Sequence, residues 1–482
     1  LFNRMRLFYK NLNVLKIDKP QNLNPAFSKF EIKSIKFKQG KKMSDIGVVV
    51  LAAGLGTRMK STKPKVLFEL CGEPMIIHIL RKAYEISSDV SVVLSYQKEL
   101  VGAKIKEIFP QTKIYEQNLK EFPGTAGALK NIPLNSEKTL ILCGDMPLIK
   151  TNDLIRLSAG NADVALSVFE AADPYGYGRV IINNGKVEAI VEQKDATETQ
   201  KMIKSANAGC YCFKSEVLRE ILPLIGNENS QKEFYLTDAI KIANERGLKC
   251  WAISVEEQNF MGINDKFQLS IAQNLMQDEI KKNLMKSGVL MRLPNSVYID
   301  ARAKFEGECV IEENVSVIGE CVIKNSVIKS GSVVENSVIE DSDVGPLAHI
   351  RPKCEIKNTH IGNFVELKAA KLDGVKAGHL SYLGDCEIGS GTNVGCGTIT
   401  CNYDGKAKHK TIIGKNVFIG SDTQLVAPVK VGDDVLIAAG STVTSDVPSG
   451  ALAISRTKQV NKEGFFYKFF NDAKSDDENA KK

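Results

Sequence analysis

An aliphatic residue recurs every six positions in the last third of the chain, and this period predicts the fold of that region. One run has Ile413, Ile419, Leu425, Val431, Ile437 and Val443, and an earlier one has Ile311, Val317 and Ile323 together with Val322, Ile328 and Val334. A period of six fits neither a helix nor simple strand alternation. It is typical of a left-handed parallel β-helix, in which three flat strands form a coil of about 18 residues. Stacked coils bury the repeated residue in a ladder and carry polar loops outside.

The bulk composition describes an ordinary globular chain. Its 482 residues suffice for two or three domains. No apolar run approaches the roughly 18–20 residues that span a bilayer, so we expect no membrane insertion. The eleven cysteines form no CxxC metal pair. Cys210 and Cys212 alternate on a predicted strand, which favours two core thiols on the same face. We therefore predict free thiols in a reducing, cytoplasmic environment.

The charge is unevenly distributed along the chain. Residues 1–42 carry eleven Lys/Arg and two acids, whereas the remainder holds 53 basic and 55 acidic side chains. The near-neutral body gives no reason to expect nucleic-acid binding. Residues 1–42 begin with Leu1 and lack the pattern of a signal peptide. We expect them to be a non-native leader upstream of Met43; the alternative is a disordered basic arm that binds an acidic partner.

Between Met43 and residue 264, buried strand-like runs alternate with helix-like stretches. The runs are 46–51, 90–94, 139–143, 164–169, 209–213 and 249–255. This alternation predicts an α/β domain with a Rossmann-like, mostly parallel sheet, whose ligands bind beyond the carboxyl ends of the strands. Residues 265–287 show helical spacing and predict a linker helix. The hexad domain is expected over 288–457, followed by a tail over 458–482.

A glycine-rich turn, LAAGLGTRM over residues 51–59, follows the first predicted strand. The small residues Ala52, Ala53 and Gly54 let backbone N–H groups approach a phosphate or a base edge. Arg58 adds a guanidinium and Lys65 a second charge, both suited to phosphate oxygens. Taken alone, the turn is equally consistent with a tight strand-to-helix connection. It matches neither the Walker sequence nor GxGxxG.

Further motifs follow this turn in a characteristic order. They are PKVL at 64–67, GTA at 124–126, CGDMP at 143–147, YGR at 177–179, EQKD at 192–195, NAG at 207–209 and MGIN at 261–264. Over about 220 residues they resemble the sugar-nucleotidyltransferase family. Together with the hexads, the chain from Met43 to about Phe465 resembles the bifunctional bacterial family that combines N-acetylglucosamine-1-phosphate uridylyltransferase with glucosamine-1-phosphate N-acetyltransferase.

The resemblance implies two reactions in sequence. Acetyl-CoA would acetylate glucosamine-1-phosphate, and UTP would then donate its uridylyl group to N-acetylglucosamine-1-phosphate, releasing pyrophosphate. It further implies that Asp145 and Asn264 hold Mg²⁺, a hard ion that prefers oxygen ligands. Arg58 and Lys65 would grip the triphosphate. The implied contacts to UTP and UDP-N-acetylglucosamine are Leu51, Ala52, Ala53, Gly54, Lys65, Gln117, Gly124, Thr125, Gly178, Glu192, Asn207 and Asn264.

Each of these residues also has a simpler structural interpretation when considered alone. Asp145 could cap the following helix, and Asn264 could be the N-cap of the helix predicted from residue 265. Lys65 and Glu192 could be solvated surface charges. Only the joint occurrence of the motifs favours function.

Two positions depart from the family pattern. Leu119 occupies the place where the family usually has a Gln, five residues before the Gly124-Thr125 pair. The segment looks two residues longer, so we assign the contact with uracil to Gln117. Leu55 replaces a residue that is often polar.

The hexad period is interrupted between residues 351 and 408, which predicts functional loops that leave the coil. The interruption contains Arg351, Lys368 and Lys408, a basic trio suited to a sugar phosphate, and His379, which alone would read as a packed structural histidine. The family resemblance implies that His379 is the general base of acetyl transfer, since an imidazole suits proton transfer near neutral pH. Glu366 could orient it.

The same resemblance assigns the remaining contacts of the second site. Glucosamine-1-phosphate would contact Arg351, Lys368, Tyr382, Asn393, Asn402 and Lys408. Acetyl-CoA would contact Cys396, Asn402, Tyr403, Ser421, Ala439 and Arg456. Cys396 departs from the small residue common in relatives, which leaves the packing of the acetyl arm open.

The resemblance also implies a homotrimer whose acetyl-transfer site depends on assembly. Two alternatives remain at this point. The β-helix could merely assemble a single nucleotidyltransferase, or the chain could be a non-catalytic trimeric scaffold. The basic trio argues against the first, and the joint presence of Lys65, Asp145, Asn264 and His379 argues against the second.

Overall fold

The computed structural model describes residues 45–183 and 186–470. The predicted leader, residues 1–42, and the end of the predicted tail, residues 471–482, lie outside this range. Within it, no helix combines the length and the hydropathy needed to cross a bilayer.

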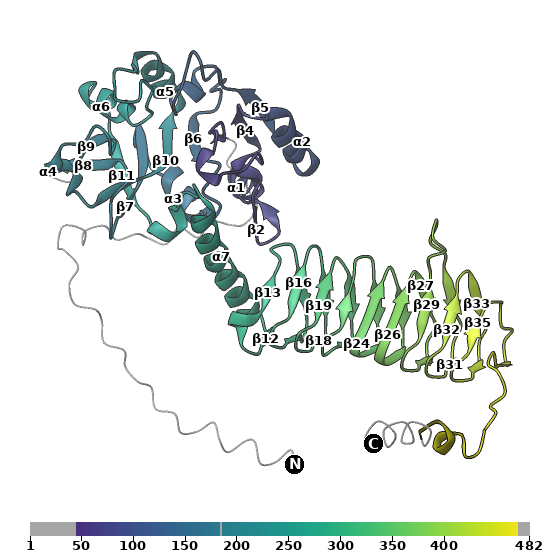
Figure 1. Cartoon of the computed structure of the whole chain (residues 1–482). Helices are drawn as coiled ribbons and strands as arrows, with labels where there is room; N and C mark the ends of the chain where they lie inside the picture. Colours follow the sequence, from purple (N-terminus) through teal and green to yellow (C-terminus); the bar gives the residue numbers. More distant parts are fainter. Residues whose placement is uncertain (1–44, 184–185, 471–482) are drawn as a thin grey trace, which may run out of the picture. The chain divides into compact units, whose positions relative to one another are not determined.

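A mixed β-sheet forms the centre of the N-terminal domain, with the strand order β11-β7-β10-β6-β1-β4-β5 (Figure 1). Its strands are β1 (Ile46–Leu51), β4 (Asp89–Leu94), β5 (Lys113–Glu116), β6 (Lys138–Cys143), β7 (Val164–Glu170), β10 (Ser205–Lys214) and β11 (Cys250–Ser254). All neighbours pair in parallel except β10, which runs antiparallel to both β6 and β7. The predicted strands and the mostly parallel sheet are confirmed. The direction of β10 and the hairpin of β8 (Arg179–Asn183) and β9 (Lys186–Val191) could not be read from local patterns.

Helices bury both faces of this sheet, as a doubly wound fold requires. Alternate residues of β1 show the division, because Val48 and Val50 belong to one hydrophobic cluster and Val49 to the other. The first cluster includes residues of α1 (Met75–Ile86), α2 (Lys98–Ile108) and α3 (Thr151–Ser158). The second includes residues of α5 (Ser215–Ile221) and α6 (Asp238–Glu245).

The predicted linker helix is present as α7 (Lys266–Lys286). Asp265 is its N-cap, and the Asp265 carboxylate accepts the backbone N–H of Gln268 at 2.8 Å. Gln277, near the middle of the helix, is buried and forms two hydrogen bonds with the backbone of Ile299 in the first coil, at 2.6 and 3.0 Å. The helix is therefore anchored to the β-helix as well as to the sheet domain.

The hexad region winds into stacked coils, from β12 (Leu290–Met291) to β36 (Leu452–Ala453) (Figure 1). One face is an eight-stranded parallel sheet from β14 (Lys304–Glu306) to β33 (Val429–Val431). The other two faces join at a corner, because the long strands β24 (His360–Lys368) and β26 (Lys376–Gly384) continue across it. The predicted parallel β-helix is confirmed.

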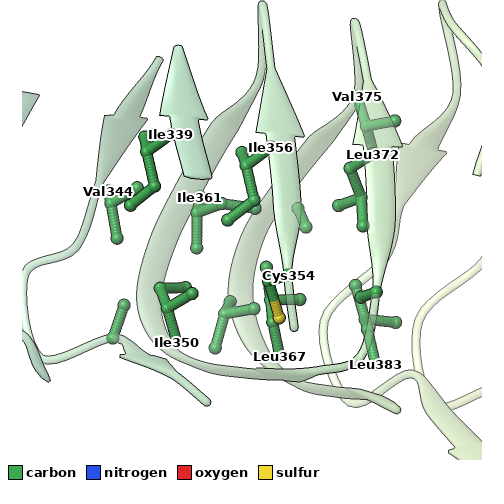
Figure 2. Close-up of a cluster of buried hydrophobic side chains, with 14 of the residues drawn as sticks. Ile339, Val344, Ile350, Cys354, Ile356, Ile361, Leu367, Leu372, Val375 and Leu383 are labelled. Carbon is green, nitrogen blue, oxygen red and sulfur yellow. The ribbon is translucent and has the colours of Figure 1, made fainter. Parts of the chain in front are cut away.

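The ladder of buried aliphatic residues is continuous through the region where the hexads appear interrupted (Figure 2). Val344, Ile350, Ile356, Ile361 and Leu367 all point into the same interior and are essentially inaccessible to solvent. The prediction that loops leave the coil between residues 351 and 408 is therefore wrong for most of this segment, which stays within the coil. These coils are shorter than 18 residues: Val322 aligns with Val338, and Lys371 with Glu387, one coil later. In these shorter coils the buried residues no longer recur every six positions along the sequence. Each coil still completes a full turn of the β-helix.

Two local features of the hexad region also bear on the predictions. Val322 is only half-buried and its neighbour Ile323 is in the ladder, so the predicted phase of Val322 is wrong by one residue. An excursion from the coil does occur later, between β29 (Ile399–Cys401) and β30 (Thr411–Ile413). Across it the register passes from Glu387 to Ile412 in a single coil.

Candidate active sites

A cavity of about 590 Å³ lies at the carboxyl end of β1. Its lining brings together most of the residues predicted for the first site: Leu51, Ala52, Ala53, Gly54, Arg58, Lys65, Gln117, Gly124, Thr125, Asp145 and Asn264. These residues come from five separate segments. Their convergence at the carboxyl ends of parallel strands is the arrangement expected for ligand binding in an open α/β sheet.

A compact polar cluster lies within the lining of this cavity. Nζ of Lys65 lies 2.5 Å from Oδ2 of Asp145 and 3.0 Å from Oδ1 of Asn264. Nη2 of Arg58 donates to the same Asn264 oxygen at 2.8 Å. Asn264 is thus not the helix N-cap, a role taken by Asp265, and Asp145 holds Lys65 rather than capping a helix. Both structural alternatives for these two residues are wrong.

The donor set of this cluster fits a magnesium ion accompanied by its substrate. Asp145 and Asn264 present one carboxylate and one amide oxygen to the same point, which the Lys65 ammonium now occupies. Mg²⁺ is usually bound through one or two carboxylates plus substrate phosphates and water, and not by a complete protein cage. The described residues contain no cluster of three or more His, Cys, Asp or Glu able to hold a metal.

The glycine-rich turn exposes backbone to the cavity. A Cβ on Gly54 would meet nothing within 4 Å, so the cavity directly borders the main chain there. Gly124, which also lines the cavity, has φ 93°, and a Cβ would lie 2.6 Å from the carbonyl oxygen of Phe234. Only glycine is compatible with that backbone conformation and that contact.

Gln117 borders the cavity but its amide is already engaged. Its Nε2 donates to the carbonyl oxygens of Phe122 and Gly124, each at 2.8 Å. Both amide hydrogens are therefore used in shaping the loop that carries Gly124. Leu119, which stands where the family usually has a Gln, also lines the cavity.

Gly178, Glu192 and Asn207 form a second group, which does not line this cavity. The backbone N–H of Asn207 donates to Gly178 O at 2.8 Å, and a Cβ on Gly178 would lie 3.4 Å from the Glu192 carboxylate. Thr237 donates to that carboxylate at 3.2 Å. Burial raises the pKa of Glu192. A partly buried carboxylate that packs against a glycine backbone suits recognition of sugar hydroxyls.

Sequence patterns did not single out Thr237 or Glu233. Glu233 lines the cavity, and Thr237 contacts Glu192. Both belong to the segment EFYLTD, whose acidic and hydroxyl residues surround two aromatic positions. That composition was the only available signal, and it is too common to be specific.

In the β-helix, His379 shares one edge with three predicted acetyl-CoA residues. His379, Cys396, Ser421 and Ala439 each directly precede a residue in the left-handed region of φ, namely Leu380, Gly397, Asp422 and Gly440. They therefore occupy equivalent corner positions in successive coils, and all four are exposed. Arg456 extends the edge, since its guanidinium donates to Ala439 O at 2.6 Å.

The predicted phosphate-binding residues gather on an adjoining face. Tyr382 lies beside Glu366 in the register of β24 and β26, and Lys368 lies beside Gly384. Asn402 donates to Asp385 at 2.5 Å and approaches the Tyr382 hydroxyl at 3.4 Å. The ammonium of Lys408, and to a lesser extent Arg351, lowers the pKa of Lys368. A nearby like charge disfavours the charged form, and an anion bound to both ammonium groups would offset their repulsion.

Glu366 does not act as the partner of His379 within one chain. It pairs with Arg351 at 2.9 Å, while the register places His379 beside Asn363. Leu380 forms a corner between His379 and Tyr382, so Glu366 and His379 lie on different faces. The hypothesis that Glu366 orients His379 receives no support from these contacts.

The remaining two predicted residues occupy separate places. Asn393 lies on β28 (Asn393–Val394) and, with His360 and Lys376, lines a shallow cavity of about 530 Å³. Tyr403 is 61% exposed in the excursion after β29, where its hydroxyl donates to Gly405 O at 2.8 Å.

Comparisons with known proteins agree with the two-part architecture. Residues 48–229 match the MobA-like NTP transferase domain, and residues 410–445 match the bacterial transferase hexapeptide repeat. Among solved structures, the inositol-1-phosphate CTP transferase from T. maritima aligns with 48% of this chain and 95% of that one, at 18% identity and a TM-score of 0.38. That likeness is too distant to support an argument.

Three curated relatives match nearly their full length, and each is named Bifunctional protein GlmU. The Campylobacter curvus protein is 75% identical over 428 residues, covering 89% of this chain and 98% of the relative. The Campylobacter concisus protein is 73% identical over 427 residues, with the same coverage. A Campylobacter jejuni protein is 60% identical over 423 residues, covering 88% and 99%. The chain therefore belongs to the GlmU family and is a bifunctional enzyme of uridylyl and acetyl transfer.

Proposed function

We propose that the two sites act in sequence to make UDP-N-acetylglucosamine. The β-helix acetylates glucosamine-1-phosphate with acetyl-CoA, and the N-terminal domain joins the product to the uridylyl group of UTP. The observation that carries the first site is the convergence of Lys65, Asp145 and Asn264 in one cavity. The edge shared by His379 and Cys396 carries the second.

In the N-terminal cavity, the sugar phosphate attacks the α-phosphorus of UTP and pyrophosphate leaves. The protein needs to hold two anions in line and offset their charge, with little covalent work of its own. Arg58 and Lys65 bind the triphosphate. Backbone groups of residues 51–54 and 124–125, with Gln117, hold the nucleoside, and Gly178, Glu192 and Asn207 bind the N-acetylglucosamine.

Asp145 and Asn264 would hold Mg²⁺, which would neutralise phosphate charge at the reacting centre. In the absence of nucleotide, the Lys65 ammonium keeps these two oxygens together. When the triphosphate binds, Lys65 can exchange this contact for phosphate oxygens. The same lysine thus serves as a structural cation and a substrate ligand.

In the β-helix, His379 accepts a proton from the glucosamine amine as the amine attacks the thioester carbonyl. The new amide bond forms, the carbon–sulfur bond breaks, and CoA leaves as the thiol. Arg351, Lys368 and Lys408 bind the phosphate of the sugar, and Tyr382, Asn393 and Asn402 bind the sugar. Acetyl-CoA lies along the edge of Cys396, Ser421, Ala439 and Arg456, with further contacts from Asn402 and Tyr403.

We further propose a homotrimer that completes this second site. Leu347, Phe364 and Leu380 form an apolar strip on successive corners and are 50%, 56% and 60% exposed. All three have positive φ, an unfavourable conformation for bulky residues that indicates a specific use. Leu380 directly follows His379, so another copy packed on this strip would also shield the proposed base from water.

The partners of the enzyme would thus be its small-molecule substrates and copies of itself. All eleven cysteines are free, and eight are buried. Uncombined thiols in such number suit a reducing cytoplasm.

His379→Ala separates the two halves of this proposal. It should lower CoA release from acetyl-CoA and glucosamine-1-phosphate at least about a hundredfold, the loss typical of a general base. Pyrophosphate release from UTP and N-acetylglucosamine-1-phosphate should remain unchanged. If both activities fall in a folded variant, or if neither does, the role of His379 is wrong. Sedimentation of the wild type tests the trimer independently.

A further inference from the structure

The excursion after β29 is a compact loop that carries three proposed substrate contacts. They are Asn402, Tyr403 and Lys408. Tyr403 and Lys408 face each other in an antiparallel bridge, and the backbone N–H of His409 donates to Asn402 O at 2.8 Å. Because the loop is outside the coil, packing against the aliphatic ladder does not determine its shape. Interactions within the loop must therefore hold its conformation.

One carboxylate, that of Asp404, holds the loop together. Its Oδ1 accepts the backbone N–H groups of Lys406 and Ala407 at 2.8 and 2.7 Å. Its Oδ2 lies 2.6 Å from Nε2 of His409, on the returning side. These hydrogen bonds, that of Ala407 first, hold the pKa of Asp404 far below its usual range. The group is therefore an ionised acceptor, and Nε2 of His409 is the donor.

The loop must also oppose an electrostatic force. Lys408 is held beside Lys368, and the two ammonium groups repel each other while no anion lies between them. The root of the loop is fixed to the same patch, since Asp385 N donates to Lys368 O at 2.8 Å and the Asp385 carboxylate accepts from Asn402. The tip has no such anchor. Without an internal link, repulsion would favour conformations in which Lys408 turns into solvent.

We propose that Asp404 and His409 are positioning residues for the sugar phosphate: their hydrogen bond closes the loop and holds Lys408 next to Lys368 before substrate arrives. Neither residue needs to touch the substrate. The Asp404–His409 contact strengthens substrate binding, because the loop is already ordered and the two like charges are already close before the substrate binds. Binding then loses less free energy to these two changes. This inference rests on the proposed acetyl-transfer function and adds to it two residues to which the sequence analysis assigned no role.

Two substitutions of His409 in the full-length enzyme distinguish positioning from simple packing. His409→Phe keeps the ring but removes the donor, whereas His409→Gln places an amide nitrogen close to the position of Nε2. The KM for glucosamine-1-phosphate should rise about five- to tenfold in His409→Phe, with kcat within about twofold, as expected for losing one charge-assisted hydrogen bond at a half-exposed site. His409→Gln should remain within about twofold of the wild type in KM.

A binding measurement avoids any dependence on the chemical step. Glucose 1-phosphate carries the phosphate but lacks the amine, so calorimetry gives its Kd without turnover. The Kd should follow the KM: weaker in His409→Phe and restored in His409→Gln. Lys410→Ala is the matched control, because it removes the neighbouring ion pair of Lys410 with Glu387, at 2.5 Å, and should leave the Kd unchanged.

Uridylyl transfer provides the internal check on folding, since it uses the other domain. An unchanged Kd in His409→Phe, or an equal loss in His409→Phe and His409→Gln, would overturn the positioning role. Failure of the wild type to acetylate glucosamine-1-phosphate or to bind glucose 1-phosphate is a different result, and it would remove the proposed function together with this inference.

Discussion

Lys65 and Asp145 form an ion pair of 2.5 Å within the lining of the N-terminal cavity, and the same lysine reaches Asn264 at 3.0 Å. The pair is largely enclosed, with side-chain exposures of 13% and 22%. Enclosed charges are costly unless paired. Asp145 therefore has a counter-charge both without nucleotide, from Lys65, and with it, from the proposed Mg²⁺.

Asp145→Asn should selectively remove uridylyl transfer. The amide keeps the shape of the side chain but loses the charge proposed to bind Mg²⁺, and we expect pyrophosphate release to fall about 10²- to 10³-fold. Acetyl transfer, measured on the same preparation, should not change. Asp163→Asn is the control, because Asp163 pairs with Lys214 at 2.8 Å in the same domain but outside the cavity. Equal losses in both variants would contradict a specific role for Asp145.

Glu192→Gln should stabilise the folded protein and weaken uridylyl transfer. Burial raises the pKa of Glu192 in the folded protein, so the folded state favours its neutral form. The folded state then binds more protons than the unfolded state, and stability decreases as pH rises from the unfolded pKa through the folded one. A glutamine side chain does not ionise, so it avoids the free-energy cost of burying a charge. The variant should unfold at a higher temperature than the wild type near neutral pH, and the difference should vanish below about pH 4.

The single tryptophan, Trp251 on β11, reports on this domain by fluorescence during unfolding. Uridylyl transfer by Glu192→Gln should show a KM for N-acetylglucosamine-1-phosphate raised about tenfold, the effect of losing a charged hydrogen bond to a sugar hydroxyl. Glu188→Gln, an exposed position on the preceding strand β9, should alter neither property. A lower unfolding temperature for Glu192→Gln at pH 7 would contradict the burial argument.

Thiol alkylation at pH 7.5 should inactivate acetyl transfer and spare uridylyl transfer. Cys396 is the exposed cysteine on the His379 edge. Burial raises the pKa of Cys71 to about 11 and that of Cys210 to about 12, so these thiols stay protonated and unreactive. Mass spectrometry should find N-ethylmaleimide on Cys396 first, and acetyl-CoA should slow the labelling. Cys396→Ala should resist inactivation; complete labelling of Cys396 without loss of acetyl transfer would refute the placement of acetyl-CoA.

Gly72→Ala should weaken the junction between the N-terminal domain and the first coil. A Cβ on Gly72, which has φ 87°, would lie 1.8 Å from Oδ2 of Asp300. Asp300 is fully buried and bound by Arg302 at 2.8 Å, so it cannot move away without loss. We expect a destabilisation of about 3–5 kcal/mol, the range for breaking a buried ion pair.

Gly176→Ala separates this clash from backbone strain. Gly176 has φ 88°, but a Cβ there would meet nothing within 4 Å. Its replacement should cost only about 1 kcal/mol, the strain of a left-handed conformation. Urea unfolding of the two variants measures the difference. Similar midpoints would mean that Asp300 readily moves aside.

The sequence predicted those features that depend on local patterns. Six-residue spacing identified the β-helix, since burial of every sixth side chain is imposed by the coil itself. Buried-strand runs identified the sheet for a similar reason. The motifs around Lys65, Asp145 and Asn264 pointed to residues that meet in one cavity, the proposed nucleotide site, although they lie far apart in the chain.

Only the tertiary structure showed where these residues meet and which predictions from local sequence patterns were wrong. The apparent gap in the hexads is a run of shorter coils, because a turn of the β-helix can close with 16 residues as well as 18. The Glu366–Arg351 pair, the His379 edge and the Asp404–His409 link depend on stacking between coils and on a loop closing upon itself. Such contacts join residues whose separation along the chain has no fixed period, so no local pattern could reveal them.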